Sequence, residues 1–322
     1  MNDRSRLQNV LYIAPGGCTG YPGTIGDSLL QEPLVRTLGD RRLFPNVERI
    51  EWVCNPIAPV LFQKKGYDSR ARFNPWKNPE KTSMPTPLGK CDLAIIAYYD
   101  VEDIIDQTKV EDIAGNTPIF TPYPKLNPQG NVHLTRQIHS ALSNLLPRGY
   151  HPPRPQFSVT EKDVREADKM KAKLGLFEKS YNICHISCGE MEKSWCPESW
   201  ARLVLLLKRD LDKKAVFTYA PAHRKIFESI REKAKVDVFG VSLSLGGLAA
   251  LAQDAYAFIS PDSGPMQLMA AAGARGINMA AKMNPRTWAP LSELIYTIDR
   301  YPGDIKDISP EEVAVEFKKR FC

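Results

Sequence analysis

Short apolar runs alternate with amphipathic stretches along most of the chain. In the first half, apolar runs occupy 10–14, 50–54 and 93–97, and apolar residues recur at helical spacing over 28–38. Runs of this length predict buried strands, and the helical spacing predicts a helix. A glycine-rich turn, 16–26, joins the first run to the helix. The chain therefore opens with the strand, turn and helix of a doubly wound α/β unit.

The second half repeats this rhythm. Apolar runs that predict strands occupy 182–186, 215–219, 236–239 and 255–259, and helical patterns occupy 160–174, 197–209, 223–234 and 245–253. Thr160 is suited to cap the first of these helices, because its hydroxyl can accept a hydrogen bond from a backbone N–H of the first turn. Strands that alternate with helices predict a parallel sheet covered on both faces.

Two proline-containing segments interrupt the pattern. Segment 64–90 is basic and shows little periodicity, so we expect a long irregular excursion there. Segment 147–155 is rich in proline and cannot pair as a central strand, which is typical of a linker. A length of 322 residues also favours two domains. We therefore predict two domains, 1–150 and 151–322, and the last helix is a candidate for packing back on the N-terminal domain.

Composition and charge narrow the class of partner. The chain is 43% hydrophobic and 25% charged, which is typical of a globular protein and excludes a disordered or collagen-like chain. The formal net charge is +6, and the longest cationic string is Lys318-Lys319-Arg320. This bias is too small for a nucleic-acid-binding surface, so no nucleic-acid partner is expected. A positive surface does favour an anionic substrate or an anionic membrane face.

The cysteines and the apolar profile indicate a reduced, cytoplasmic protein. Seven cysteines are an odd number, the first ten residues lack an apolar signal core, and no apolar stretch reaches the length of a membrane helix. Cys184, Cys188 and Cys196 raise the question of a metal site. Their spacing matches no standard zinc pattern, so a structural role is favoured and no metal ligands are predicted.

A polar turn, Asp262-Ser263-Gly264, lies between the predicted strand 255–259 and a helix of small residues. Free N–H groups at the start of that helix would bind an anion, and Gly264 would let the backbone approach a phosphate closely. The alternative is that Asp262 or Ser263 only caps the helix. The local pattern leaves both interpretations open.

Two further segments carry polar residues that could act in a site. Ser187 and Lys193 lie in the loop after strand 182–186, where a lysine suits a phosphate, although a lone lysine is more often a solvated surface residue. Asp27 follows the first glycine-rich turn, where it could act as a general base or simply cap the helix. The chain has no GxGxxG, P-loop, HExxH or GxSxG motif. Dinucleotide, metal-hydrolase and catalytic-triad chemistry therefore lack support.

Taken in order, these motifs resemble those of glycosyltransferase family nine, the heptosyltransferase-like enzymes with a GT-B fold. The segments that carry the resemblance are 24–36, 44–53, 193–200, 262–273, 284–290 and 308–313. Segment 193–200, KSWCPESW, is similar to the family's K-x-W-P-x-x-x-[FW], with one extra residue before the proline. Segment 262–273, DSGPMQLMAAAG, closely matches D-[ST]-G-x-x-H-x-A-A-A-x-G, with Gln267 in place of the usual histidine.

The resemblance implies two Rossmann-like, doubly wound parallel-sheet domains that face each other across a cleft. Domain 1–150 would bind the acceptor and domain 151–322 the donor. It also implies an inverting, metal-independent transfer of heptose or a related sugar from a nucleotide-diphosphate sugar. Asp27 would be the catalytic base. The donor would be held by Ser187, Lys193, Asp262, Ser263 and Gly264.

The resemblance further implies the partners and the location of the enzyme. No cofactor is expected, and the co-substrate would be a nucleotide sugar, with an ADP-sugar favoured. The acceptor would be an anionic glycan or glycolipid of lipopolysaccharide biosynthesis, reached by a cytoplasmic enzyme that contacts the inner face of the cytoplasmic membrane. Arg224 stands where related enzymes commonly carry a ribose-reading glutamate. The alternatives are an inactive nucleotide- or glycan-binding protein and a sugar-nucleotide epimerase.

Overall fold

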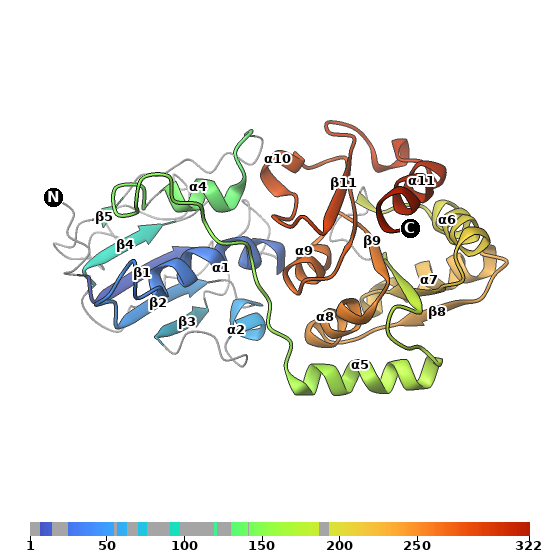
Figure 1. Cartoon of the computed structure of the whole chain (residues 1–322), viewed down its shortest axis with the longest axis horizontal. Coiled ribbons are helices and arrows are strands. Elements are labelled where there is room, and N and C mark those ends of the chain that lie inside the picture. The colour runs from blue at the N-terminus through green and yellow to red at the C-terminus, as the bar shows by residue number, and fades with distance from the viewer. Residues whose placement is uncertain are drawn as a thin grey trace. The chain divides into compact units, whose positions relative to one another are not determined.

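The computed structural model describes residues 7–14, 25–54, 57–62, 70–75, 91–96, 119–120, 130–140, 142–186 and 193–322 (Figure 1). The chain divides into two compact units, Met1–Gln156 and Phe157–Cys322, and each is described by itself. The division directly follows the proline-rich segment 147–155.

The first unit is built on a parallel sheet. Its described strands are β1 (Asn9–Ala14), β2 (Arg49–Cys54), β3 (Ala71–Pro75), β4 (Leu93–Ile96) and β5 (Ile119–Phe120), in the order β3-β2-β1-β4-β5. Its described helices are α1 (Ile25–Gly39), α2 (Ile57–Phe62) and α4 (Leu134–Ser140). Trp52 of β2 stacks on Tyr12 of β1 and on Phe62 of α2, and all three are buried. The predicted strands at 10–14, 50–54 and 93–97 and the helix at 28–38 are confirmed.

The prediction of an irregular excursion over 64–90 is wrong for the part that the structure describes. Ala71–Pro75 forms β3, which pairs in parallel with β2. This strand lies at the edge of the sheet, where Pro75 is tolerated because one side of the strand needs no partner. Its short alternation, with Arg72 exposed and Phe73 partly buried, is too brief to stand out from the basic, proline-containing residues around it.

The second unit is also built on a parallel sheet. Its described strands are β6 (Tyr181–His185), β7 (Lys214–Thr218), β8 (Val238–Val241), β9 (Ala257–Pro261), β10 (Gly276–Ala280) and β11 (Ile295–Asp299), in the order β11-β10-β9-β6-β7-β8. Its described α-helices are α5 (Glu161–Leu174), α6 (Pro197–Asp210), α7 (Arg224–Lys233), α8 (Leu245–Asp254), α9 (Gly264–Ala271), α10 (Pro285–Trp288) and α11 (Pro310–Phe321). The described part of this unit also contains the 3₁₀ turns η3 (Pro221–His223) and η4 (Ile305–Asp307). All strands and helices predicted in this half are confirmed, and β10 and β11 extend the sheet.

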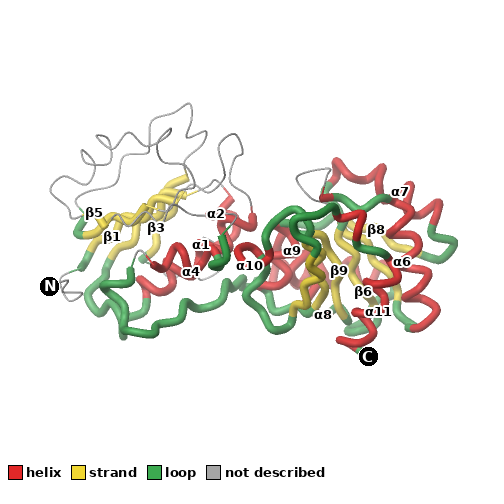
Figure 2. Tube along the Cα trace, turned by 90° about the horizontal axis from the view of Figure 1, so that it is seen from above, coloured by secondary structure: helices red, strands yellow, loops and turns green. Residues whose placement is uncertain are grey.

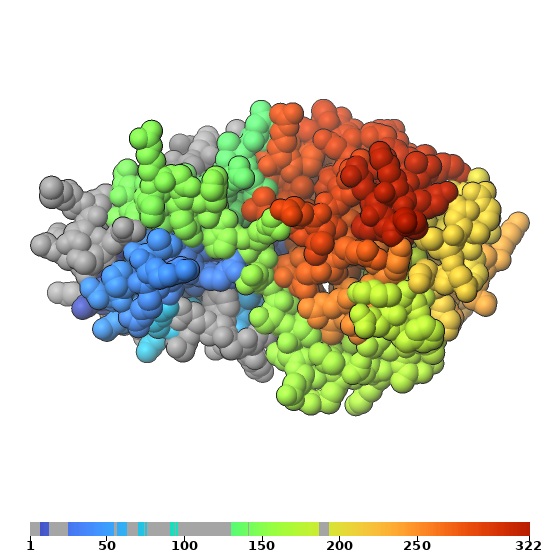
Figure 3. Space-filling view, viewed as in Figure 1, coloured from blue at the N-terminus to red at the C-terminus, as the bar shows by residue number. Residues whose placement is uncertain are grey.

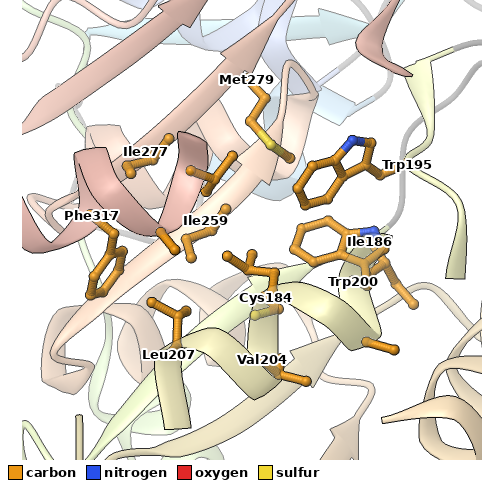
Figure 4. Close-up of a cluster of buried hydrophobic side chains, with 14 of the residues drawn as sticks. Cys184, Ile186, Trp195, Trp200, Val204, Leu207, Ile259, Ile277, Met279 and Phe317 are labelled. Carbon is orange, nitrogen blue, oxygen red and sulfur yellow. The ribbon is translucent and has the colours of Figure 1, made fainter. Parts of the chain in front are cut away.

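Helices cover both faces of the second sheet (Figure 2). On one face, α6 and α11 pack together over a core that includes Cys184, Ile259 and Phe317 (Figure 4). Figure 3 shows the two helices side by side at the surface, α6 in yellow and α11 in dark red. On the other face, α8 packs against α5 and α9. Burial of apolar side chains on both faces explains why the strands read as continuous apolar runs in the sequence.

Local capping fixes where α5 begins and ends. The Thr160 side chain accepts a hydrogen bond from the Asp163 N–H, and the Asp163 carboxylate accepts one from the Thr160 N–H at 2.9 Å, so the two residues form a capping box. Gly175 ends the helix with a left-handed φ of 59°, a conformation that glycine adopts without steric cost. The predicted role of Thr160 as a cap is confirmed.

Candidate functional site

The carboxyl edge of the second sheet carries the described donor residues predicted for that unit, Lys193, Asp262, Ser263 and Gly264. β6 and β9 are neighbours in space, but β7 and β8 lie between them in the sequence, so the strand order reverses between β6 and β9. In open parallel sheets, ligands bind outside the carboxyl ends of the strands at such a reversal. Lys193 lies beyond the end of β6, and Asp262 directly follows β9.

Lys193 and Asp262 line the same small pocket, whose volume is about 10 Å³. Met279, Lys282 and Ile305 also line it. A lysine and an aspartate that follow different strands therefore share one concavity. Ser187, the other donor residue predicted after β6, lies outside the described residues.

The turn after β9 is held by hydrogen bonds that leave two N–H groups available. The Asp262 N–H donates to the Met279 carbonyl at 3.0 Å, and the Ser263 hydroxyl accepts from the Met266 N–H at 3.2 Å. Ser263 is thus the N-cap of α9, and capping is compatible with anion binding by the same helix end. Pro265 has no N–H. Among the described residues, the N–H groups of Ser263 and Gly264 donate no hydrogen bond, so they are the donors that α9 offers a ligand.

Trp195 anchors the segment that carries Lys193. Its indole ring meets Trp200 of α6 edge-on, with 5.2 Å between ring centroids and 88° between planes. Figure 4 shows Met279 of β10 beside the same indole. The indole N–H donates to the Ile308 carbonyl at 3.1 Å. Because the Trp195 side chain is buried and its N–H is hydrogen-bonded, the backbone two residues after Lys193 has a fixed position.

Sequence reasoning missed the basic residues beyond β10 and β11. Lys282 follows β10 and lines the Lys193–Asp262 pocket, and it also lines an adjoining hollow of about 380 Å³. Ser194, Gly303, Asp304 and Lys306 are among the other residues of that hollow. The signal that pointed to Lys193, a lysine just after a buried strand, is also present at Lys282, but β10 was not recognised as a strand.

The two departures from the family pattern have distinct surroundings. The Gln267 amide of α9 donates to the Trp288 carbonyl at 2.5 Å, so it ties α9 to the end of α10. Gln267 is buried, whereas Arg224 is exposed and pairs with Glu228 at 3.0 Å within α7. Gln267 therefore has a structural partner next to the site, and Arg224 has its charge balanced on its own helix.

A row of polar side chains crosses the sheet beneath the site. Its members are Thr218, His185, Ser260, Asn278 and Thr297, from β7, β6, β9, β10 and β11. The first four are buried. His185 Nδ1 lies 2.8 Å from the Thr218 hydroxyl, and the Asn278 amide donates to the Thr297 hydroxyl at 3.4 Å. Buried polar groups are costly without hydrogen bonds, and these two contacts offset part of that cost. The row makes the carboxyl side of the sheet polar beneath the site.

Asp27, the predicted base, lies in the first unit. It is in the first turn of α1, where the helix dipole stabilises a carboxylate, and only 7% of its surface is exposed. The glycine-rich loop that precedes it, 15–24, lies outside the described residues. Catalysis and helix-end stabilisation are both compatible with this position.

In the described part of the chain, no group of three or more His, Cys, Asp or Glu side chains is placed to hold a metal ion. Cys184 is buried in the core, which raises its thiol pKa to about 12, and Cys196 is exposed at the start of α6. None of the described helices has the length and apolarity needed to span a membrane.

Solved structures with the same fold include several sugar-transferring enzymes. A glycosyltransferase family 9 protein from Veillonella parvula DSM 2008 matches with a TM-score of 0.77 at 17% identity, over 99% of this chain and 98% of that one. Heptosyltransferase WaaC of E. coli with ADP matches with a TM-score of 0.67 at 16% identity, over 97% and 100%. The ADP-heptose lipopolysaccharide heptosyltransferase II of E. coli gives 0.67 at 16%, over 98% of each chain. These matches confirm the predicted GT-B fold.

Sequence comparisons identify the family. A search against curated proteins finds no match. The family model for glycosyltransferase family 9 (heptosyltransferase) matches residues 123–304, which is more than half of the 322 residues. It includes the Lys193 segment, the Asp262–Gly264 turn and Lys282. The chain therefore belongs to glycosyltransferase family 9.

Proposed function

We propose that this glycosyltransferase moves heptose or a related sugar, with inversion at the anomeric carbon, from a nucleotide-diphosphate sugar to a glycan acceptor. The observation that carries the proposal is the pocket shared by Lys193 and Asp262 at the strand-order reversal of the second sheet. One residue supplies a positive charge for a phosphate, and the other a carboxylate that can accept hydrogen bonds from sugar hydroxyls.

The donor would lie along the carboxyl edge of the second sheet. Lys193 and the N–H groups of Ser263 and Gly264 would hold the diphosphate and stabilise the negative charge that develops on it as the glycosidic bond breaks. Asp262 would contact the donor sugar, and Ser187 would complete the phosphate site. ADP is the favoured nucleotide, since the structurally similar WaaC was solved with ADP.

Asp27 would be the general base. Its carboxylate would remove the proton from the acceptor hydroxyl, whose oxygen attacks the anomeric carbon as the nucleoside diphosphate departs. Domain 1–150 would bind the acceptor and domain 151–322 the donor. The reaction would need no metal, because the lysine and the backbone N–H groups take the charge-stabilising role.

The acceptor would be an anionic glycan or glycolipid of the lipopolysaccharide type. The net charge of +6 supports an acidic partner. An enzyme of this kind would work in the cytoplasm, at the inner face of the cytoplasmic membrane. No further cofactor enters this proposal.

Thermal stabilisation tests the donor site. The protein is heated with ADP, GDP, UDP and their sugars, because a ligand at a hundred times its Kd stabilises the folded state by about 2.7 kcal/mol. We expect a rise in Tm with at least one nucleotide, reduced in Lys193→Ala and kept in Lys169→Ala, which removes an exposed lysine of α5. Absence of a shift with every nucleotide at millimolar concentration would contradict the proposal.

A second experiment tests catalysis. Asp27→Asn should bind the nucleotide sugar as the wild type does but lose transfer by about a hundred-fold or more. Asp212→Asn, at a fully exposed position after α6, is the matched control and should transfer normally. Wild-type transfer by Asp27→Asn would refute the base assignment, and nucleotide binding without transfer in the wild type would indicate an inactive binding protein. Full activity after treatment with EDTA is expected.

A further inference from the structure

The residues that follow the strands of the second sheet are arranged along its carboxyl edge in the order of those strands. Going outward from the strand-order reversal, Asp262 follows β9, Lys282 follows β10 and Lys306 lies beyond β11. In the other direction, Lys193 lies beyond β6 and Tyr219 follows β7. A ligand whose diphosphate lies at the reversal therefore extends one end toward β7 and the other toward β10 and β11.

The β7 side suits a nucleoside. Tyr219 stacks on Phe227 of α7 with 5.2 Å between ring centroids and 18° between planes, and Tyr219 is only partly buried. A partly exposed aromatic ring offers a face on which a base can stack. On α7, the helix that carries Phe227, Arg224 is paired with Glu228 at 3.0 Å.

The β10–β11 side is basic and hollow. Lys282 and Lys306 both line the hollow of about 380 Å³, and Lys282 also belongs to the Lys193–Asp262 pocket. The two concavities share Ala281 as well, so they adjoin. Lys282 and Lys306 are both exposed, so a ligand can reach them.

The Asp304 carboxylate lines this hollow, and its contacts are with its own segment of the chain. One of its oxygens accepts a hydrogen bond from the Lys306 N–H at 2.9 Å, and the other lies 3.6 Å from Lys306 Nζ. The Lys306 N–H, followed by the charges of Lys306 and Lys282, lowers the pKa of Asp304. Asp304 therefore stays ionised and holds Lys306 at the hollow, while Lys193, Lys282 and Lys306 together outnumber Asp262 and Asp304.

We propose that Lys282 and Lys306 form a subsite for an anionic group carried by the transferred sugar, so that the donor is the nucleotide derivative of an acidic sugar. This inference rests on the proposed donor site. The diphosphate already has Lys193 and the N-terminus of α9, and a nucleoside on this side would offer the two lysines no anion. A carboxylate on the sugar would offer them an anion, and each lysine can donate a charge-assisted hydrogen bond to that carboxylate.

Two sugar phosphates without a base test the subsite independently of nucleotide specificity. Glucuronic acid 1-phosphate and glucose 1-phosphate differ only at C6, which is a carboxylate in one and a hydroxymethyl group in the other. Their affinities are measured by isothermal titration or ligand-observed NMR with wild type, Lys282→Met, Lys306→Met and the control Lys169→Met. We expect the wild type to bind the acidic compound about three- to ten-fold more tightly. That ratio should fall toward one in the first two variants and persist in the control.

The outcomes separate this subsite from the proposed function. Equal affinity of the wild type for the two sugar phosphates, in a protein that nucleoside diphosphates do stabilise, would overturn the subsite and leave the donor site standing. The same holds if the preference survives in both lysine variants. Inorganic phosphate that binds alongside a nucleoside diphosphate and is lost in Lys282→Met would assign the lysines to an acceptor phosphate, which also overturns the proposal. Failure of every nucleoside diphosphate to stabilise the protein would instead reject the donor site itself.

Discussion

The indole N–H of Trp195 donates to the carbonyl of Ile308, 3.1 Å away, and so joins the segment after β6 to the segment before α11. Both residues are buried. Trp195→Phe would keep most of the apolar packing but leave the Ile308 carbonyl without its partner, so the free energy of unfolding should fall by about 1–3 kcal/mol. Urea unfolding measures this. Phe177→Leu, at a 72% exposed position, should change it by less than about 0.5 kcal/mol. Equal effects of the two substitutions would show that the hydrogen bond contributes nothing.

Two N-cap serines allow capping to be separated from ligand binding. Ser263 caps α9 beside the site, and Ser309 caps α11 by accepting a hydrogen bond from the Glu312 N–H at 3.1 Å. Replacing either with alanine should lower the free energy of unfolding by about 1 kcal/mol. Only Ser263→Ala should also weaken nucleotide binding, because only α9 starts at the proposed phosphate site. Equal nucleotide affinity of the two variants would show that the Ser263 side chain acts only as a cap, since the backbone N–H at this position is present in both proteins.

Much of the second unit could be predicted from the sequence because its strands are buried on both faces. β6, β7 and β9 are short apolar runs bounded by turn residues, and the predicted bounds lie close to the observed ones. β10 escaped the same reasoning, since its apolar run is short and is interrupted by the polar residue Asn278. β3 escaped for the opposite reason: an edge strand needs only a brief apolar pattern.

The site could be predicted only in part because it depends on sheet order. The sequence shows that Lys193 and Asp262 each follow a strand. It does not show that these two strands are neighbours, because their order in the sheet depends on a crossover that hydrophobic periodicity does not encode. Lys282 lines the same pocket because β10, the strand before it, pairs with β9. The bond from Gln267 to the Trp288 carbonyl links two helices and has no signature in the sequence pattern.

His139 should make the stability of the first unit depend on pH. Its Nδ1 lies 2.8 Å from the Thr135 carbonyl and its Nε2 lies 3.0 Å from the Thr37 hydroxyl, which also contacts the Tyr150 hydroxyl at 3.0 Å. Burial lowers its pKa from 6.5 to about 4. The unfolded chain therefore binds a proton at a higher pH than the folded chain does. Stability from this residue is complete above pH 6.5 and is lost as the pH falls toward 4, by about 3 kcal/mol in total.

The pH effect is measured by comparing wild type with His139→Gln. Urea unfolding is repeated at several pH values between 4 and 7, so that the contributions of all other titrating groups cancel in the difference. We expect the wild type to lose its stability advantage as the solution becomes more acidic. A difference that stays constant across this range would show that His139 titrates alike in the folded and unfolded chains.

Glu32 holds the end of the linker onto α1, the helix that carries Asp27. Its carboxylate is 1% exposed, lies 3.2 Å from Arg36 Nε, and accepts a hydrogen bond from the Gln156 N–H at 3.2 Å. Arg36 in turn donates to the Arg154 carbonyl. Phe157, the next residue along the chain, donates its N–H to the Ala271 carbonyl of α9 in the second unit. Gln156 is therefore attached to the first unit, and Phe157, the next residue, is attached to the second.

Glu32→Gln should loosen the first of these attachments. Loss of a buried charge that serves two donors is expected to lower the free energy of unfolding by about 2 kcal/mol, and hydrogen–deuterium exchange at the Gln156 amide should become faster. The matched control is Glu161→Gln, which breaks an exposed ion pair with Arg165 and should cost less than about 0.5 kcal/mol. Because the amide of Phe157 bonds to α9 and not to α1, its exchange should not change in Glu32→Gln. Faster exchange at both amides would mean that the whole linker is released together, and it would contradict separate attachment to the two units.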